Sequence, residues 1–292
     1  MPKHSEREPA KIALVTGASS GIGRATAERL AAVGYKVYGT SRRVAAADGQ
    51  SFEMLTLDVT NDESVTAAVS EVIRREGRID LLVNNAGFSL APAGAEESSI
   101  EQAQSIFDTN FFGIVRMTRA VVPHMRNQRS GRIINIGSIL GFLPAPYMAL
   151  YAATKHAVEG YSESLDHEIR TWGIRVSVLE PASTNTQIDA NAPEADAMVD
   201  AYHEARTAVG HRLTEMIENG DGPGLVADVV LKAASAARPK LRYTVGSLAS
   251  RLRLLRTFAP VGMVDAAIRK ELRLDALTAS LPRTPVLEKS SI

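Results

Sequence analysis

Strand-like and helix-like segments alternate through the first 180 residues of the chain. Short runs rich in apolar and β-branched residues are separated by longer segments with apolar residues at helical spacing. Because parallel strands need a crossover connection, usually a helix, this alternation predicts a parallel sheet with helices on both faces. The predicted strands lie at residues 11–16, 36–41, 52–59, 79–84, 132–138 and 174–181.

The helices between these strands have recognisable ends. Segments 23–34 and 61–77 finish on Gly34 and Gly77, which are predicted C-caps. Two longer helices are expected at about 100–126 and about 147–171. After Pro181 the pattern changes, and the sequence there predicts a helix at 226–236, a last strand at 242–246 and two short amphipathic helices, "RLRLLRTFAP" and "VDAAIRKELRL".

Together these segments predict an α/β fold, a Rossmann-type doubly wound parallel sheet of about seven strands. We expect a flexible N-terminus at 1–10 and one catalytic domain at 11–247. A helical substrate lid is expected at about 187–220, and a C-terminal helical extension with a frayed tail at 248–292.

Composition removes several classes of function. Lys plus Arg equals Asp plus Glu, 33 each, so charge offers no reason to expect a nucleic-acid partner. The chain has no cysteine, which excludes disulfides and thiolate ligands, and no spacing of His and acids indicates a metal site. The uncharged stretch 133–154 contains Asn, Gly and Pro, so it favours strand, loop and helix start over a membrane span, and we expect a cytoplasmic protein.

A glycine cluster, "VTGASSGIGRA", directly follows the first predicted strand. Gly17, Gly21 and Gly23 suit a sharp turn, a close approach of backbone to a phosphate and tight packing of helix on strand. The following helix would direct its N–H groups at the phosphate, although three glycines could also serve only the turn. The cluster lacks the Gly-Lys-[Ser/Thr] of a P-loop, which argues against an NTPase.

The chain resembles the classical short-chain dehydrogenase/reductase family over about residues 10–190. "TGASSGIG" matches that family's cofactor motif, and further family motifs follow in order. They are Asp58, "NNAG" (84–87), Asn110, Ser138, "YAATK" (151–155) and the segment beginning at Pro181. The whole pattern is most similar to the hydroxysteroid- and retinol-dehydrogenase-like branch. The glycine spacing differs from the T-G-x-x-G-x-x-G of nucleotide-sugar epimerases in the extended branch.

This resemblance implies a nicotinamide cofactor, and the segment "GTSRR" favours NADP(H). Ser41 stands where NAD-preferring members carry an acid, and Arg42 and Arg43 follow. A guanidinium can bind a 2′-phosphate bidentately, so we expect Arg42 as the main contact and Arg43 as a helper. The alternative is a pair of solvated arginines at a loop start.

Family motifs imply the remaining cofactor contacts. Asp58 resembles the residue at the adenine ring, although it could simply belong to a helix N-cap region, and Asn84 is expected to brace the sheet. Ala182 departs from the family, because a glycine often follows the proline there. The complete implied set is Gly17, Ser19, Ser20, Gly21, Ile22, Gly23, Ser41, Arg42, Arg43, Asp58, Val59, Asn85, Ala86, Gly87, Tyr151, Lys155, Pro181, Ala182, Thr184 and Thr186.

A tyrosine four residues before a lysine makes chemical sense beside a nicotinamide. Tyrosine has an ordinary pKa of about 10, and a charge at ~4 Å would lower it by about three units at an effective dielectric of ~20. By resemblance, Tyr151 is the acid/base and Lys155 lowers its pKa and binds the cofactor ribose. Tyr147 lies two turns from Lys155, about 12 Å, and is interpreted as a pocket wall or helix start.

Two further residues complete the catalytic set that the resemblance implies. Ser138 matches the serine that hydrogen-bonds the substrate oxygen, and Asn110 matches the asparagine that holds a relay water. Singly, Asn110 could be a helix kink, Ser138 a turn residue and Lys155 a surface charge. "NIGSILG" lacks the G-x-S-x-G elbow of a hydrolase.

The segment after Ser138, "ILGFLPAPYMAL", is strongly apolar. Leu140, Phe142 and Met148 could line a substrate pocket with Ser138 and Tyr151, or could instead be core or subunit contacts. The expected substrate is a small apolar alcohol or ketone of steroid, retinoid or acyl type. The family commonly pairs its two long helices, here about 100–126 and 147–171, so we expect a homodimer or homotetramer. The alternative function is a catalytically silent NADP-binding regulator or scaffold.

Overall fold

A computed structural model describes residues 9–43, 51–186 and 192–275. Three parts of the predicted segments lie outside the described residues. They are residues 1–8 of the expected flexible N-terminus (1–10), residues 187–191 of the expected lid (about 187–220) and residues 276–292 of the expected C-terminal extension and tail (248–292). The strands are β1 (Ile12–Val15), β2 (Lys36–Ser41), β3 (Glu53–Thr56), β4 (Leu81–Asn84), β5 (Gly131–Ile136), β6 (Ile174–Pro181) and β7 (Arg242–Val245). The α-helices are α1 (Gly21–Ala32), α2 (Asp62–Glu76), α3 (Ile100–Phe107), α4 (Gly113–Gln128), α5 (Ala149–Ile169), α6 (His203–Glu218), α7 (Pro223–Ser235), α8 (Gly246–Phe258) and α9 (Val261–Glu271).

The seven strands form one parallel sheet in the order β3-β2-β1-β4-β5-β6-β7. Strand order reverses direction at β1 and β4, so this is a doubly wound sheet, as the alternation of segments predicts. Every strand predicted from the sequence is present, including the last one at 242–245. The carboxyl ends of the strands therefore meet at one edge, where ligands bind in open α/β sheets.

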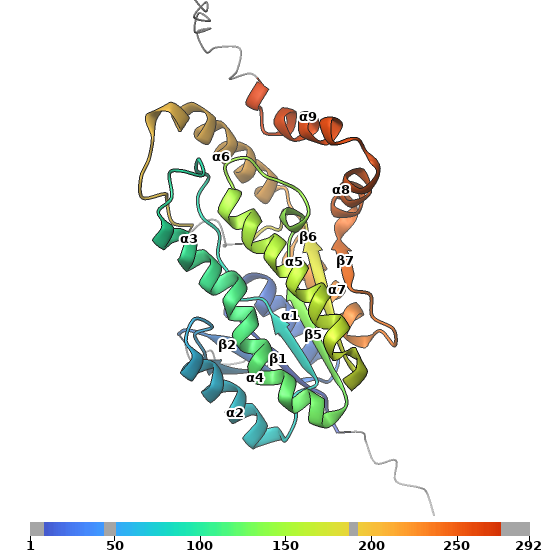
Figure 1. The fold of residues 1–292 in the computed structure, drawn as a ribbon. Helices are drawn as coiled ribbons and strands as arrows, with labels where there is room; N and C mark the ends of the chain where they lie inside the picture. Colours follow the sequence, from blue (N-terminus) through green and yellow to red (C-terminus); the bar gives the residue numbers. More distant parts are fainter. Residues whose placement is uncertain (1–8, 44–50, 187–191, 276–292) are drawn as a thin grey trace, which may run out of the picture.

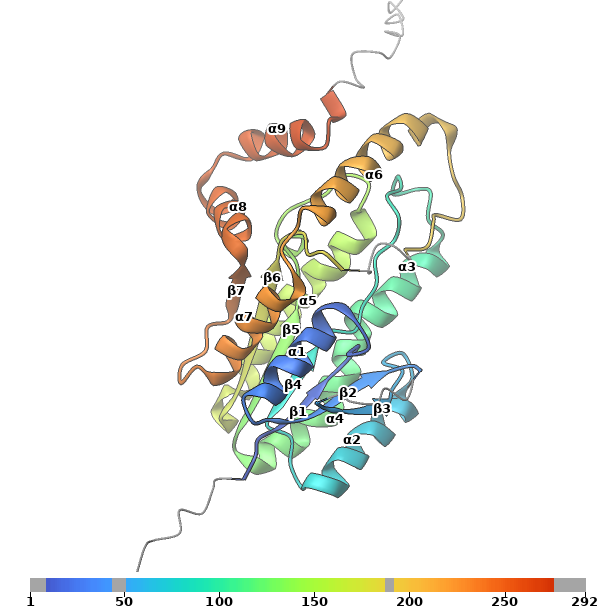
Figure 2. The same cartoon turned by 180° about the vertical axis from the view of Figure 1, so that it is seen from behind.

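Helices cover both faces of the sheet. Successive residues of β1 alternate between the two cores: Ile12 and Leu14 pack with α2, α4 and α5, whereas Ala13 and Val15 pack with α1 and α7. This is the side-chain alternation of a strand buried on both faces. Figure 1 shows α2, α4 and α5 in front of the sheet, and Figure 2 shows α1 and α7 on the opposite face.

The expected helix at about 100–126 differs from the sequence prediction. It is divided into α3 and α4 by a π-helical turn, Asp108–Phe112. Such turns insert an extra residue into the helix and re-aim a side chain, which here is Asn110. The side-chain amide of Asn110 forms hydrogen bonds with Phe88 in the loop after β4. The spacing of apolar residues in the helix could not predict this contact.

Three of the helices after β6, namely α6, α8 and α9, lie at the carboxyl end of the sheet (Figures 1 and 2). Helix α6 follows the segment 192–202, and α8 and α9 come after β7, somewhat earlier than the amphipathic patterns indicated. None of the helices in the described ranges is long and apolar enough to cross a bilayer.

Candidate active site

The glycine turn after β1 is built as the sequence predicts. Gly17 and Gly21 have left-handed φ angles of 66° and 55°, which favour glycine. A Cβ at Gly17 would lie 2.9 Å from Cα of Ala86, and one at Gly23 would overlap the carbonyl oxygen of Gly17. Helix α1 begins at Gly21, so its free N–H groups face the turn. The cradle has the close backbone approach that a pyrophosphate needs.

The "NNAG" segment braces this turn. The side-chain amide of Asn85 donates to the carbonyls of Thr16 and Gly17, 3.0 Å each. The hydroxyl of Thr16 accepts from the backbone N–H groups of Asn85 and Ala86 at 2.9 and 3.0 Å. These bonds tie the ends of β1 and β4 together and fix the backbone that the resemblance assigns to the cofactor.

Asn84 holds the sheet rather than the turn, as expected. Its buried amide donates to Oδ1 of Asn135 at 2.8 Å, and the amide of Asn135 donates to the hydroxyl of Ser162 at 2.8 Å. The network joins β4, β5 and α5 in the interior. It therefore fixes α5 against the sheet below the catalytic candidates.

Beside the end of β2, polar groups gather around Asp58. Asp58 accepts from the backbone N–H and the hydroxyl of Thr60 at 2.9 and 2.7 Å. Burial opposes the charge of Asp58, but these hydrogen bonds and the guanidiniums of Arg42 and Arg116 outweigh it and lower its pKa. Ser41 ends β2, Arg42 and Arg43 are exposed, and the Arg43 N–H donates to the Ser41 hydroxyl at 3.4 Å. The guanidinium groups of Arg42 and Arg43 are therefore exposed to solvent at the end of β2.

Helix α5 carries both Tyr151 and Lys155 into one cavity. Lys155 is buried, and its Nζ donates to the carbonyl of Ile136 at 2.9 Å. The same Nζ lies 5.5 Å from the centre of the Tyr151 ring. Burial lowers the pKa of Lys155 to about 8. The lysine is therefore still a cation at neutral pH, and it lies beside the tyrosine ring.

The π-helical turn directs Asn110 at the loop after β4. Its Oδ1 accepts from the N–H of Phe88 and its Nδ2 donates to the carbonyl of Phe88, both at 2.9 Å. The Nδ2 also lies 3.4 Å from the hydroxyl of Thr154, the residue before Lys155. Asn110 is almost fully buried and connects the loop after β4 with the lysine-bearing turn of α5.

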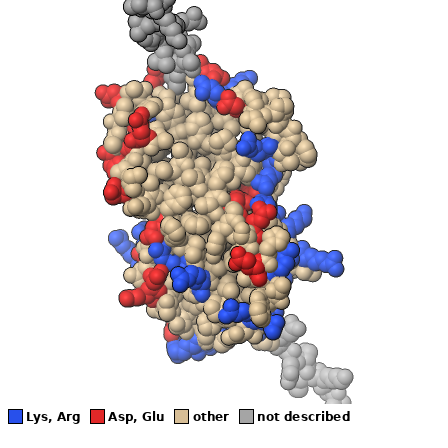
Figure 3. Space-filling model, in the orientation of Figure 1, with Lys and Arg blue, Asp and Glu red and all other residues tan. Residues whose placement is uncertain are grey.

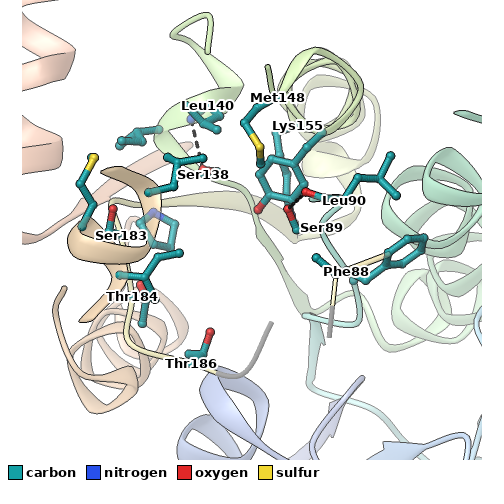
Figure 4. Close-up of a pocket in the computed structure, with 18 of the residues that line it drawn as sticks. Phe88, Ser89, Leu90, Ser138, Leu140, Met148, Lys155, Ser183, Thr184 and Thr186 are labelled. Atoms are coloured by element: carbon teal, nitrogen blue, oxygen red, sulfur yellow. Dashed lines mark hydrogen bonds between the residues drawn. The ribbon is translucent and has the colours of Figure 1, made fainter. Parts of the chain in front are cut away.

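Ser138 lies two residues beyond β5, on the same cavity. Its hydroxyl oxygen accepts from the N–H of Leu140 at 3.1 Å, which opens a short 3₁₀ turn, Ile139–Gly141. The hydroxyl proton of Ser138 therefore remains available to another acceptor. Figure 4 shows this hydrogen bond, with Ser138, Met148 and Lys155 around the same space.

The cavity has a volume of about 500 Å³, and its walls come from several segments that lie far apart in the sequence. Figure 4 shows residues of the loop after β4, the loop after β5, α5 and the segment after β6 facing one another. Among its lining residues are Asn85, Gly87, Ser138, Leu140, Met148, Tyr151, Lys155, Pro181, Ala182, Thr184 and Thr186, all of which the sequence singles out. The structure thus brings the predicted catalytic residues Ser138, Tyr151 and Lys155 together, with Asn110 behind them.

Two aromatic residues lie elsewhere. Phe142 does not line this cavity; it is buried in a separate cluster with Ala249 of α8 and Val264 of α9. Tyr147 has a left-handed φ of 65° and packs edge-on against Tyr202, with ring centres 6.2 Å apart. It borders a smaller neighbouring recess, while Tyr151 reaches the large cavity. The geometry therefore favours Tyr151 over Tyr147 as the catalytic candidate.

Ala182, which stands where family members often have a glycine, does not have a left-handed backbone conformation. The turn therefore needs no glycine there. The hydroxyl of Thr184 donates to the Ala182 carbonyl at 3.3 Å. The side chain of Thr186 approaches Gly21, where a Cβ would lie 3.5 Å from it. This segment therefore reaches across to the glycine turn.

Sequence patterns missed much of the cavity wall. Ser89 and Leu90 after β4, Ser183 after β6, and Thr207, His211 and Ile217 of α6 also line it. The position of the first three could have been inferred, because loops after parallel strands meet at one edge. The α6 residues lie within the segment 187–220 that the sequence analysis expects as a substrate lid, although none of them was named individually. Within the parts of the chain that the structure describes, no group of His or acidic side chains could hold a metal ion.

Similarity to known proteins agrees with this geometry. A family model described as short chain dehydrogenase matches residues 11–197. The chain is 38% identical to a 3-ketodihydrosphingosine reductase of Bacteroides thetaiotaomicron, over 89% of this chain and 97% of that protein. It is 34% identical to retinol dehydrogenase 8 of Bos taurus, over 86% of each.

Solved structures agree as well. A short-chain dehydrogenase from Streptomyces avermitilis matches with a TM-score of 0.75 and 32% identity, over 94% of this chain and all of that one. A metagenomic short-chain oxidoreductase in complex with NADP matches with a TM-score of 0.64 and 27% identity, over 80% of this chain and 96% of that one. The chain therefore belongs to the short-chain dehydrogenase family, which makes it an oxidoreductase by class. The family inferred from the motifs is confirmed, and the retinol dehydrogenase relative agrees with the predicted branch.

Proposed function

We propose that the protein is an NADP(H)-dependent oxidoreductase that interconverts a carbonyl and an alcohol, with Tyr151 as the acid/base. The observation that carries this proposal is the buried Lys155 ammonium, 5.5 Å from the Tyr151 ring, on a cavity shared with Ser138. Solved relatives bound to NADP support the choice of cofactor. When bound, the nicotinamide supplies hydride transfer.

The chain's own residues fit such a cofactor at both ends. The glycine turn and the start of α1 offer N–H groups and space to a pyrophosphate. Ala86 lies against Gly17 of the turn, and Gly87, Thr184 and Thr186 line the same cavity as Tyr151. These groups would hold the nicotinamide end.

Proton transfer at Tyr151 depends on the charge of Lys155. Nζ of Lys155 lies 5.5 Å from the centre of the Tyr151 ring. At a charge separation of about 5 Å and an effective dielectric of ~20, a unit positive charge favours a phenolate by about 3 kcal/mol. Ser138 retains a hydroxyl proton that can be donated to a substrate oxygen. Tyr151 would then give its proton to the same oxygen during reduction and take it back during oxidation.

Discrimination for NADP over NAD is assigned to Arg42, with help from Arg43. Both guanidiniums are exposed at the end of β2, and Ser41 presents no acid that would repel a phosphate. Arg42→Ala should raise the KM for NADPH strongly and leave the KM for NADH nearly unchanged. Arg29→Ala on α1, which removes another partly exposed arginine, serves as the control. An unchanged ratio of NADPH to NADH efficiency in Arg42→Ala would contradict this role.

The proposed substrate is a bulky apolar ketone or alcohol of steroid, retinoid or acyl type. Leu140, Met148 and Ile217 line the cavity, whose volume is about 500 Å³. The relatives named as a 3-ketodihydrosphingosine reductase and a retinol dehydrogenase support this class. A series of ketones of rising alkyl length should show KM falling as the chain lengthens. No dependence on chain length would contradict an apolar substrate.

We also propose self-association through the face formed by α3, α4 and α5. Phe111 makes edge-on ring contacts with Phe107, Phe112 and Tyr161. Phe112 is 48% exposed and Ile100 69% exposed on this face. Figure 3 shows positive and negative side chains interspersed around a broad uncharged area of this side of the molecule. Phe112→Glu should convert a dimer or tetramer into a monomer in light scattering, and an unchanged mass would exclude this interface.

Turnover decides between this enzyme and a silent NADP-binding scaffold. Ketones and alcohols of the proposed class are tested with NADPH and NADP, following the absorbance of the reduced nicotinamide. An active panel with Tyr151→Phe inactive supports the enzyme. Tight NADPH binding without turnover on any member would favour the scaffold.

A further inference from the structure

A buried charged cluster lies behind the loop that carries Ser138, residues 137–142. Glu159 lies one helical turn beyond Lys155 on α5, and Glu180 is the residue before Pro181 on β6. Both carboxyls are buried, with 7% and 0% exposure. Buried acids need partners, and the proposed reaction assigns no role to either one.

The loop rests directly on Glu159. A Cβ at Gly141 would lie 3.0 Å from Cγ of Glu159, and one at Gly137 would lie 3.4 Å from its Oε1. Glycine at both positions therefore leaves room for the Glu159 side chain beneath the loop. Since Gly137 immediately precedes Ser138, a shift of this carboxyl would move the serine.

Two arginines from the C-terminal part of the chain face the acids. On β7, Arg242 donates to Oε2 of Glu159 at 2.9 Å and to Glu163 at 2.8 Å. On α8, Arg253 forms an ion pair with Glu180, 3.0 Å between Nη1 and Oε1. Arg242 is also 3.8 Å from that same oxygen. The C-terminal helix α8 thus reaches the interior beside the cavity.

Helix α8 also holds the far end of the loop. The guanidinium of Arg253 stacks on the Phe142 ring, 4.6 Å from its centre. Arg256, one turn nearer the end of α8, donates to the carbonyl of Phe142 at 3.2 Å. Arg253 therefore contacts both the buried acid next to Pro181 and the last residue of the Ser138 loop.

We propose that Arg253, through its ion pair with Glu180 and its stack on Phe142, is a positioning residue that holds the Ser138 loop for catalysis. Glu159 supports the loop from below. Helix α8 then contributes to the site indirectly, because none of its residues is among the described residues that line the cavity. This inference rests on the proposed function, because positioning Ser138 matters for a substrate oxygen.

The charges of the cluster make the positioning of the Ser138 loop by Arg253 sensitive to pH. Three carboxylates, Glu159, Glu163 and Glu180, face two guanidiniums, so one proton balances the cluster. Arg253 Nη1 lies 3.0 Å from Oε1 of Glu180, but no described residue makes a well-aligned hydrogen bond to either oxygen of this carboxyl. Burial, and then the charge of Glu159, raise the pKa of Glu180 to about 7. Lys155, one turn away, is directed at the Ile136 carbonyl instead.

Protonation of Glu180 below about pH 7 should weaken its pairing with Arg253 and loosen the loop. Substrate KM should therefore rise as the pH falls through about 7 in the wild type. In Glu180→Gln, whose side chain does not titrate, this inflection should disappear. An inflection that persists in Glu180→Gln would overturn the assignment.

The arginine itself is tested with three variants. Arg253→Leu should raise substrate KM about tenfold, a loss of about 1.4 kcal/mol, with the KM for NADPH unchanged. Arg253→Lys should recover part of the loss, because it keeps the charge without the planar stack. Arg251→Leu, which removes an exposed arginine of the same helix, is the matched control and should behave as wild type. Equal substrate KM in Arg253→Leu and Arg251→Leu would refute the proposal.

A second measurement needs no turnover. Hydrogen exchange of the amides at 137–142 should speed up in Arg253→Leu and stay unchanged in Arg251→Leu. Absence of turnover in the wild type would overturn the proposed function alone, while exchange still reports whether Arg253 holds the loop. Identical exchange in both variants would overturn the positioning role whatever the activity.

Discussion

Lys155 allows the sharpest physical prediction, because it is a buried cation whose Nζ donates to the carbonyl of Ile136. Burial lowers its pKa from the ordinary 10.5 to about 8 in the folded protein. The unfolded chain binds this proton more tightly than the native state does, so the charge destabilises the fold at pH 7. Stability from this residue is regained as the pH rises from about 8 towards 10.5. Between pH 7 and pH 10 the linkage amounts to about 2.5 kcal/mol.

The assay compares urea unfolding of wild type and Lys155→Met at several pH values in this range. Loss of the hydrogen bond to Ile136 affects Lys155→Met at every pH, so only the change in the difference is diagnostic. The free energy of unfolding of wild type, relative to Lys155→Met, should rise by about 2.5 kcal/mol from pH 7 to pH 10. Lys11→Met, an exposed lysine before β1, should show no such trend. A constant difference between wild type and Lys155→Met would refute the buried cation.

Other substitutions test the cofactor cradle and the interior. Gly23→Ala places a Cβ on the carbonyl oxygen of Gly17, so NADPH affinity measured by titration should fall sharply, with stability lower by about 1–3 kcal/mol. Gly160→Ala, which meets no atom within 4 Å, is its control, and equal NADPH affinity in the two variants would argue against the cradle. Asn135→Leu removes the partner of Asn84 and Ser162 and should cost about 1–3 kcal/mol in urea unfolding. A loss well below that range would mean that water satisfies the network.

Most of the fold could be predicted from the sequence for a physical reason. Strands buried on both faces are short apolar runs, and helices between them carry an apolar stripe, so each local pattern agrees with the final sheet. Glycine positions were equally informative, since the left-handed φ at Gly17 and Gly21 is a local requirement. The roles of Tyr151 and Lys155 were inferred from the family resemblance, and their i, i+4 spacing places both side chains on one helix face.

Features that depend on contacts between distant segments could not be predicted. The π-helical turn places Asn110 against the loop after β4. The spacing of apolar residues in the helix does not predict this contact. Apolar spacing could not tell that Leu140 faces the cavity while Phe142 packs under α8. In the sequence, nothing distinguishes Glu159 and Glu180 from other acidic residues. Only the fold shows that Arg242 of β7 and Arg253 of α8 pair with them.

The central claim is that Tyr151 transfers the proton with Lys155 beside it, and Tyr151→Phe tests it most directly. This variant removes only the hydroxyl and keeps the ring next to Lys155. The decisive measurement is turnover of an apolar ketone with NADPH in wild type and Tyr151→Phe, together with NADPH affinity in both. We predict that kcat falls by at least about 10²-fold while NADPH affinity changes little. Turnover in Tyr151→Phe equal to that of wild type would contradict the proposed mechanism.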